Sequence, residues 1–157
     1  MATIVSTGQI TIVDNNDARP ITAFITASNG TQQVFSKDES TVTYTPNWST
    51  ANNTLSAKVY VGGTSAASEV AAQLSNKKWS NDLGTSIGSG TTLVVNTNLD
   101  PVVAVQKVYY FEGDYTDPVT GLVSHIIAQI TLGVVKTGTN AVYLLTRGTS
   151  AIQQSDT

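Results

Sequence analysis

Alternation of apolar and polar residues predicts β-strands along most of this chain. From about residue 40 onward, short apolar runs recur roughly every eight to twelve residues between turn signals, which is the rhythm of a β-sandwich and not of βαβ units. Six strands are predicted there, namely Thr41–Thr45, Leu55–Val61, Lys77–Asp82, Thr91–Asn96, Val103–Glu112 and Leu122–Val135.

The last of these runs has the clearest period of two. Its alternation places Ile126, Ala128, Ile130, Leu132 and Val134 on one face, and puts His125, Gln129 and Thr131 mostly on the other. We therefore expect a long central strand with one buried face.

The flanking segments follow a different pattern. Residues 3–13 predict a strand, and Ile21–Ser28 and Thr31–Ser36 predict a hairpin that turns at Asn29-Gly30, the strongest short hairpin signal. Residues 1–38 are accordingly predicted to be an arm for attachment or oligomerisation, because a lone hairpin is only marginally stable in water. Residues 39–137 are predicted to form the sandwich.

Two further segments complete the predicted organisation. Ser65–Leu74 is alanine-rich and fits either one short helix or an irregular edge crossing. Residues 138–157 are predicted to hold a turn, one more strand at 141–146 and a polar tail.

The order of these strands resembles an immunoglobulin-like antiparallel sandwich, so the fold class is predicted to be all-β. The resemblance implies that Trp79 is the core tryptophan and that Tyr110 lies in the aromatic end of a later strand, although the bridging cysteines are missing. Trp48 is expected to close one end of the sandwich.

Four segments resemble Ig-like virion structural proteins of tailed bacteriophages. They are Gly8–Asp14, Asn16–Pro20, Thr43–Trp48 and Tyr115–Gly121. The resemblance spans about residues 8–137 and implies a capsid decoration, head fibre or tail accessory. It also implies other virion proteins as partners and a protein made in the host bacterial cytoplasm and carried in the virion.

Charge narrows the choice of partners. Only 12% of the residues are charged and the net charge is −3, where an ordinary soluble domain is about one-quarter charged. Basic residues are scattered except for Lys77-Lys78, so nucleic acid and anionic membranes are poor partners. No run approaches the roughly 18 apolar residues of a membrane span.

The chain also offers little catalytic chemistry. It has no cysteine and one histidine, His125, which excludes thiolate and two-histidine metal sites and leaves any Ser-His-Asp arrangement dependent on that residue. We expect His125 to be a solvent-facing strand residue, and we expect neither enzymatic activity nor a cofactor.

Two clusters remain open as binding sites. Glu112, Asp114 and Asp117 could bind calcium, but a charged hairpin end is the alternative, because Asp117-Pro118 is a common turn opener. Tyr44, Trp48 and Tyr115 could form an aromatic platform for glycan stacking, with a packed corner as the alternative.

The sequence therefore favours a non-enzymatic virion structural protein, a capsid decoration or fibre-like subunit that is bound in many copies and forms homo-oligomers. The alternative is a tail-associated receptor- or glycan-binding adhesin that recognises a host surface. Head or tail location and copy number are left open.

Overall fold

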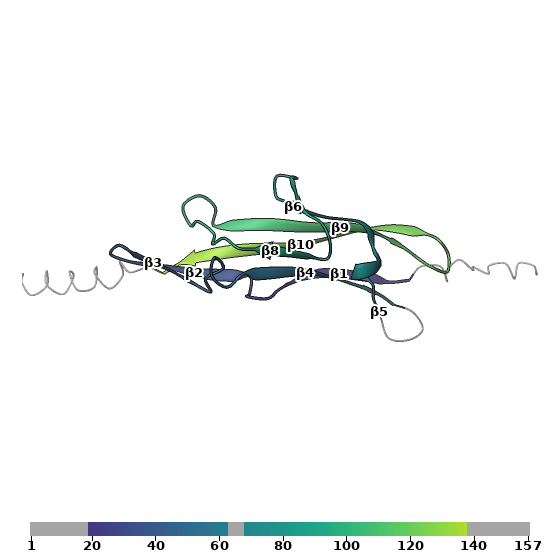
Figure 1. Ribbon diagram of the computed structural model, residues 1–157, viewed down its shortest axis with the longest axis horizontal. Coiled ribbons are helices and arrows are strands. Elements are labelled where there is room, and N and C mark those ends of the chain that lie inside the picture. Colours follow the sequence, from purple (N-terminus) through teal and green to yellow (C-terminus); the bar gives the residue numbers. More distant parts are fainter. Residues whose placement is uncertain (1–18, 63–67, 138–157) are drawn as a thin grey trace, which may run out of the picture. The chain divides into compact units, whose positions relative to one another are not determined.

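The computed structural model describes residues 19–62 and 68–137, and these residues form an all-β sandwich, as predicted (Figure 1). Within them the only helical element is the 3₁₀ turn η2 (Ala71–Gln73). The strands are β1 (Ile21–Ala27), β2 (Gln32–Asp38), β3 (Thr41–Thr45), β4 (Asn53–Val61), β5 (Ser68–Glu69), β6 (Ser75–Asn81), β7 (Ser86–Gly88), β8 (Thr92–Val95), β9 (Gln106–Thr116) and β10 (Val123–Lys136).

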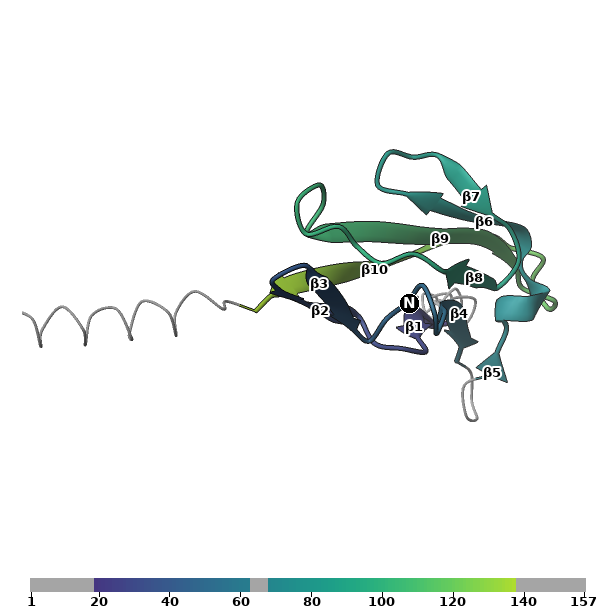
Figure 2. The ribbon, with the colours of Figure 1, turned by 60° about the vertical axis from the view of Figure 1, so that its left-hand side comes forward.

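The strands make two sheets. One has four strands in the order β1-β4-β5, with β8 also paired to β4, and the other has six in the order β3-β2-β10-β9-β6-β7 (Figure 2). The predicted core tryptophan, Trp79, lies on β6 in the six-stranded sheet.

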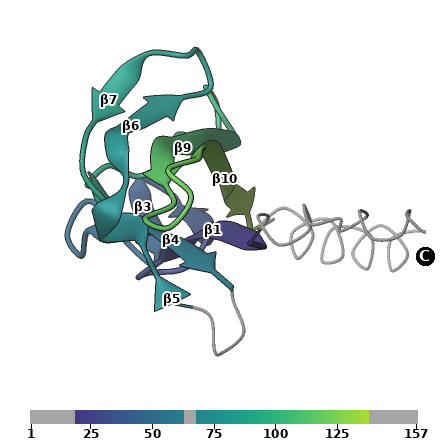
Figure 3. The same ribbon diagram turned by 90° about the vertical axis from the view of Figure 1, so that its right-hand side faces the viewer.

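The residues group into two compact units. The described part of the first comes from Met1–Thr26, Leu55–Leu93 and Tyr109–Ile130. It contains β5 beside β4 (Figure 3) and the antiparallel pair β6–β9, in which Trp79 faces Phe111. The rings of Trp79 and Phe111 lie 5.2 Å apart and both side chains are fully buried. This pair forms the centre of the first unit's core.

The second unit comes from Ala27–Thr54, Val94–Val108 and the described part of Thr131–Thr157. Here β2 pairs antiparallel with β3 and parallel with the end of β10, where Val135 lies opposite Val34. The parallel pairing makes the six-stranded sheet mixed, whereas the sequence predicts an antiparallel sandwich.

Alternation along β10 is confirmed. Its burial pattern places Ile126, Ala128, Leu132 and Val134 in the core, with Ile130 partly buried, while His125, Gln129 and Thr131 are exposed. The period of two therefore located the buried face correctly.

The predicted hairpin at Asn29-Gly30 is wrong, although the turn itself exists and Gly30 has φ of 75°. Strand β1 pairs with β4 in one sheet and β2 with β10 and β3 in the other, so the chain crosses between sheets at this turn. Asn53 holds the crossing, because its side chain accepts a hydrogen bond from Asn29 N–H and donates one to Gly30 C=O. Residues 21–38 thus contribute a strand to each sheet.

The alanine-rich segment forms no α-helix in its described part. It consists of the edge strand β5, the turn η2 and the buried Leu74, which is closer to the expected edge crossing. The strands predicted at 3–13 and 141–146 lie outside the described residues. No helix in the described part of the chain is long and apolar enough to cross a membrane.

Candidate functional site

The aromatic residues of β9 are distributed differently from the prediction. Tyr109 and Phe111 are buried, at 4% and 0% exposed, while Tyr110 is only half-buried. Strand alternation explains this, since Tyr110 shares its phase with Glu112 and Asp114 on the outer face. The core aromatic expected at Tyr110 is therefore supplied by its two neighbours.

Trp48 is fully buried in the second unit and makes two hydrogen bonds there. Its indole N–H donates to Asn29 C=O at 3.2 Å, and its backbone N–H donates to Asn98 Oδ1 at 2.7 Å. Asn98 in turn donates to Asn47 Oδ1 at 2.9 Å. Trp48 thus packs a corner and fixes the loop that follows β3.

Gln33 lies at the centre of the same arrangement and is fully buried. Its amide nitrogen donates to Pro46 C=O at 2.8 Å and to Asn98 Oδ1 at 2.6 Å, and its amide oxygen accepts from Leu99 N–H at 2.9 Å. We call Gln33, Asn47, Trp48 and Asn98 the polar loop core. Its bonds join β2 to two loops distant in sequence.

Of the two alternatives for Tyr44, Trp48 and Tyr115, a glycan platform is contradicted at two of the three residues. Trp48 is fully buried and Tyr115 is 5% exposed, so neither ring offers a face for sugar stacking. Tyr44 is half-buried and packs edge-on against Phe35, with ring centroids 5.3 Å apart. The side chains serve packing instead.

The first unit carries a group of polar and charged side chains across three strands. His125 on β10 approaches two carboxylates of β9, with Nδ1 2.6 Å from Asp114 Oδ1 and Nε2 3.5 Å from Glu112 Oε2. On the other side, Lys78 of β6 lies 2.8 Å from Glu112, and Asn76 donates to Asp114 at 2.7 Å. We call these five residues the charge cluster.

Strand geometry explains the charge cluster. Glu112 and Asp114 are two positions apart and therefore share the outer face of β9, and Lys78 lies directly opposite Glu112 in the β6–β9 register. Asn76 reaches Asp114 from an irregular segment of β6, where its φ is 52°.

The contacts shift the titration of both groups in the closest pair. The hydrogen bond to Asp114, followed by the charges of Asp114 and Glu112, raises the pKa of His125 above 6.5. Hydrogen bonds from Asn76 and His125 lower the pKa of Asp114 below 3.8. The ion pair between Asp114 and His125 is therefore favoured at every pH between the pKa values of the two groups.

This arrangement stabilises a charged imidazolium, which conflicts with a role as general base. Both ring nitrogens of His125 point at carboxylates, whereas a general base needs one nitrogen free to accept a proton from its substrate. The charge cluster therefore fits a structural role, in which side-chain contacts link the neighbouring strands β6, β9 and β10.

The three acidic residues considered as a possible calcium site, Glu112, Asp114 and Asp117, are used differently. Asp117 lies in the β9–β10 turn, where its Oδ1 accepts from Val119 N–H at 2.7 Å and from Thr120 N–H at 3.1 Å, and its Oδ2 lies 3.3 Å from Arg19. These contacts, the backbone hydrogen bonds first, lower the pKa of Asp117. Among residues 19–62 and 68–137, no group of three or more acidic, histidine or cysteine side chains is placed to hold a metal ion.

Sequence reasoning did not bring His125 together with the acidic residues, and it missed the polar loop core. The first could have been found, because the alternation that puts His125 outside on β10 also puts Glu112 and Asp114 outside on β9. The second left no signal, since Gln33 and Asn98 are 65 positions apart.

Comparison with known proteins found no family model, no curated protein and no solved structure that matches this chain.

Proposed function

We propose that this chain is a non-enzymatic structural protein of a tailed-bacteriophage virion, a capsid decoration or fibre-like subunit present in many copies. Other virion proteins are its partners, and its mechanism is binding by shape and repetition. The proposal rests first on the four segments that resemble Ig-like virion proteins.

The observation that carries the proposal is the structural role of two of these four segments, the two that lie wholly within the described residues. Thr43–Trp48 ends β3 and inserts Trp48 into the core. Tyr115–Gly121 forms the β9–β10 turn, in which Asp117 N–H donates to Leu122 C=O and Gly121 N–H donates to Asp117 C=O, both at 2.8 Å. These segments serve folding, as expected of a structural module, and they leave the surface free for assembly contacts.

The surface chemistry also fits many weak contacts. With 12% charged residues and a net charge of −3, the chain exerts little long-range electrostatic steering. A symmetric particle compensates, because many identical sites raise the effective concentration of each contact. Modest individual affinity is then sufficient for stable attachment.

The alternative, a receptor- or glycan-binding adhesin, is less well supported by the positions of its candidate residues. It depended on an aromatic platform, and two of the three rings are buried.

The proposal is tested on particles purified by density gradient from a lysate of the strain that carries the gene. Quantitative mass spectrometry should find the chain in the particle band at many copies, and immunogold labelling should place it on the head surface. A matched lysate with the gene deleted controls for antibody specificity. Absence of the chain from the particle band would overturn the virion assignment, whereas labelling of the tail tip alone would favour the adhesin.

A further inference from the structure

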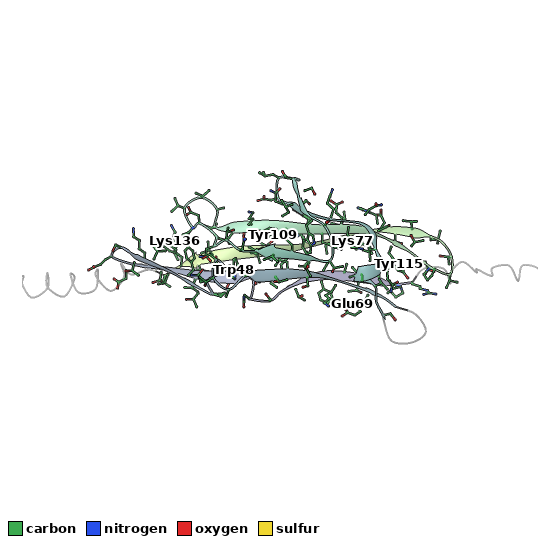
Figure 4. The ribbon with its side chains drawn as sticks, viewed as in Figure 1. Trp48, Glu69, Lys77, Tyr109, Tyr115 and Lys136 are labelled. Atoms are coloured by element: carbon green, nitrogen blue, oxygen red, sulfur yellow. The ribbon has the colours of Figure 1, made fainter. Side chains whose placement is uncertain are left out.

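Most edge strands of the described sheets are poor templates for another chain. Strand β5 has two residues and carries Glu69 (Figure 4), β7 has three residues, and β3 runs directly into Pro46. Shortness, charge and proline are the features by which natural sheets discourage pairing with a neighbour. These edges are therefore protected.

The first half of β10 lacks such protection. The pairing of β10 with β2 covers Gly133–Lys136, so among the described residues Val123–Ile130 have a paired strand only on the β9 side. The segment reads Val-Ser-His-Ile-Ile-Ala-Gln-Ile. It contains no lysine, arginine, carboxylate or proline.

The direction of the backbone groups along this edge follows from hydrogen bonds further along β10. Gly133 N–H donates to Thr31 C=O on the β2 side, and Val134 N–H donates to Val105 C=O on the β9 side. Successive residues of a strand alternate in this respect, so odd-numbered residues direct N–H and C=O to the open side. His125 and Ile127 are therefore the central pairing positions of the edge.

The other sheet is open at the same place. Strand β1 is the outermost described strand of its sheet, and Ile-Thr-Ala-Phe-Ile-Thr-Ala is also uncharged. A cavity of about 270 Å³ lies between the two edges, lined by Ile21, Ala23, Ser124, His125, Ile126 and Ile127. No described strand closes this side of the first unit.

We propose that a second copy of this chain pairs with this edge, its β10 running antiparallel to the first β10 about a two-fold axis. A two-fold interface places each strand against its own copy, so the strand must be self-complementary. The segment meets this condition because it carries no lysine, arginine or carboxylate, and the charge of its one ionisable residue, His125, is balanced by Glu112 and Asp114 of the same copy. Val123 and Ile127 are 64% and 62% exposed, and the pairing would bury part of this apolar surface.

The pairing is strand addition, in which main-chain hydrogen bonds supply affinity and alternate side chains supply fit. It extends the six-stranded sheet across two copies. The inference rests on the edge itself and does not depend on the virion assignment, so either could fail alone.

The oligomeric state of the full chain tests the proposal. Sedimentation velocity over a concentration series should show a monomer–dimer equilibrium. Ile127→Pro removes an outward N–H and leaves the even-numbered β9 bonds intact, which a free edge tolerates. Each dimer then loses two symmetry-related hydrogen bonds. We therefore expect the dissociation constant of the dimer to rise by about tenfold or more.

Ile127→Lys keeps the backbone and places a charge on the edge, so it should also favour monomers if the proline variant fails to fold. Leu83→Lys is the matched control, since Leu83 is 84% exposed in the β6–β7 turn, and it should dimerise like the parent chain. A parent chain that stays monomeric would refute the proposal. So would dimers that persist in both Ile127 variants.

Amide hydrogen exchange separates a second copy from coverage by the chain itself. The amides of His125 and Ile127 should exchange slowly at high protein concentration and rapidly on dilution. Slow exchange at every concentration would mean that another part of the same chain covers the edge, and the two-copy proposal would then be wrong.

Discussion

Replacing Gln33 with leucine removes the central connection of the polar loop core without creating a large cavity. Three hydrogen bonds disappear, those with Pro46 C=O, Asn98 Oδ1 and Leu99 N–H. Asn98 Oδ1 keeps its bond from Trp48 N–H, so two backbone groups lose a partner inside the second unit.

The magnitude follows from those two groups. Each buried polar group left without a partner costs about 1–3 kcal/mol. Leucine at this fully buried position returns part of this through apolar burial. We therefore expect Gln33→Leu to lower the free energy of unfolding by about 2–4 kcal/mol.

Urea denaturation followed by tryptophan fluorescence and circular dichroism measures this change, and Trp48 lies within the affected network. Gln32→Leu is the matched control, because the adjacent Gln32 is exposed on β2 and should change stability by no more than about 0.5 kcal/mol. Equal stability of the two variants would refute the reasoning, since it would mean that water or rearranged side chains satisfy the freed groups.

Three further predictions follow from the core, the charge cluster and the turn. Trp79→Ala should lower the unfolding free energy by about 3–5 kcal/mol in the same assay, and a change below about 1 kcal/mol would contradict its place in the core. In an NMR titration His125 should show a pKa above 6.5 that falls in Asp114→Asn. The stability that this raised pKa contributes is present below pH 6.5 and is lost as the pH rises through the folded value; an unchanged His125 pKa in the variant would argue against the contact. Thermal melts with and without EDTA should coincide, and a drop of several degrees in chelator would reveal a metal site.

Local sequence patterns predicted the strands well, because burial alternates wherever one strand face meets the core. Strand β3 matches its predicted bounds, and the buried positions of β10 follow the period of two. Tyr110 was expected at the aromatic end of a strand from the immunoglobulin-like resemblance and not from alternation, and it lies on the outer face of β9. A slip of one position reverses the face of a strand, and Tyr109-Tyr110-Phe111 offers an aromatic residue in either phase.

Partner choice between strands was not predictable from local signals. Asn29-Gly30 does form a turn, but the hydrogen bonds that decide its direction come from Asn53, more than twenty positions away. The parallel β2–β10 pairing is more distant still, since Thr137 and Phe35 are 102 positions apart. Hairpin rules consider only residues that are close in the chain. They therefore cannot predict contacts between residues that are distant in sequence.

The same limit applies to the sites, and β10 illustrates it. Its alternation correctly placed His125 outside, yet the charge cluster exists only because β9 and β6 bring Glu112, Asp114 and Lys78 to that face. Likewise, a run without lysine, arginine or carboxylate, such as Val123–Ile130, reads in the sequence as an ordinary central strand. Only the topology places this first half of β10 at an edge. At an edge, the absence of lysine, arginine, carboxylate and proline acquires a second meaning, because strands without these residues invite pairing. The physical reading of one segment therefore changes from core element to interaction surface once its neighbours are known.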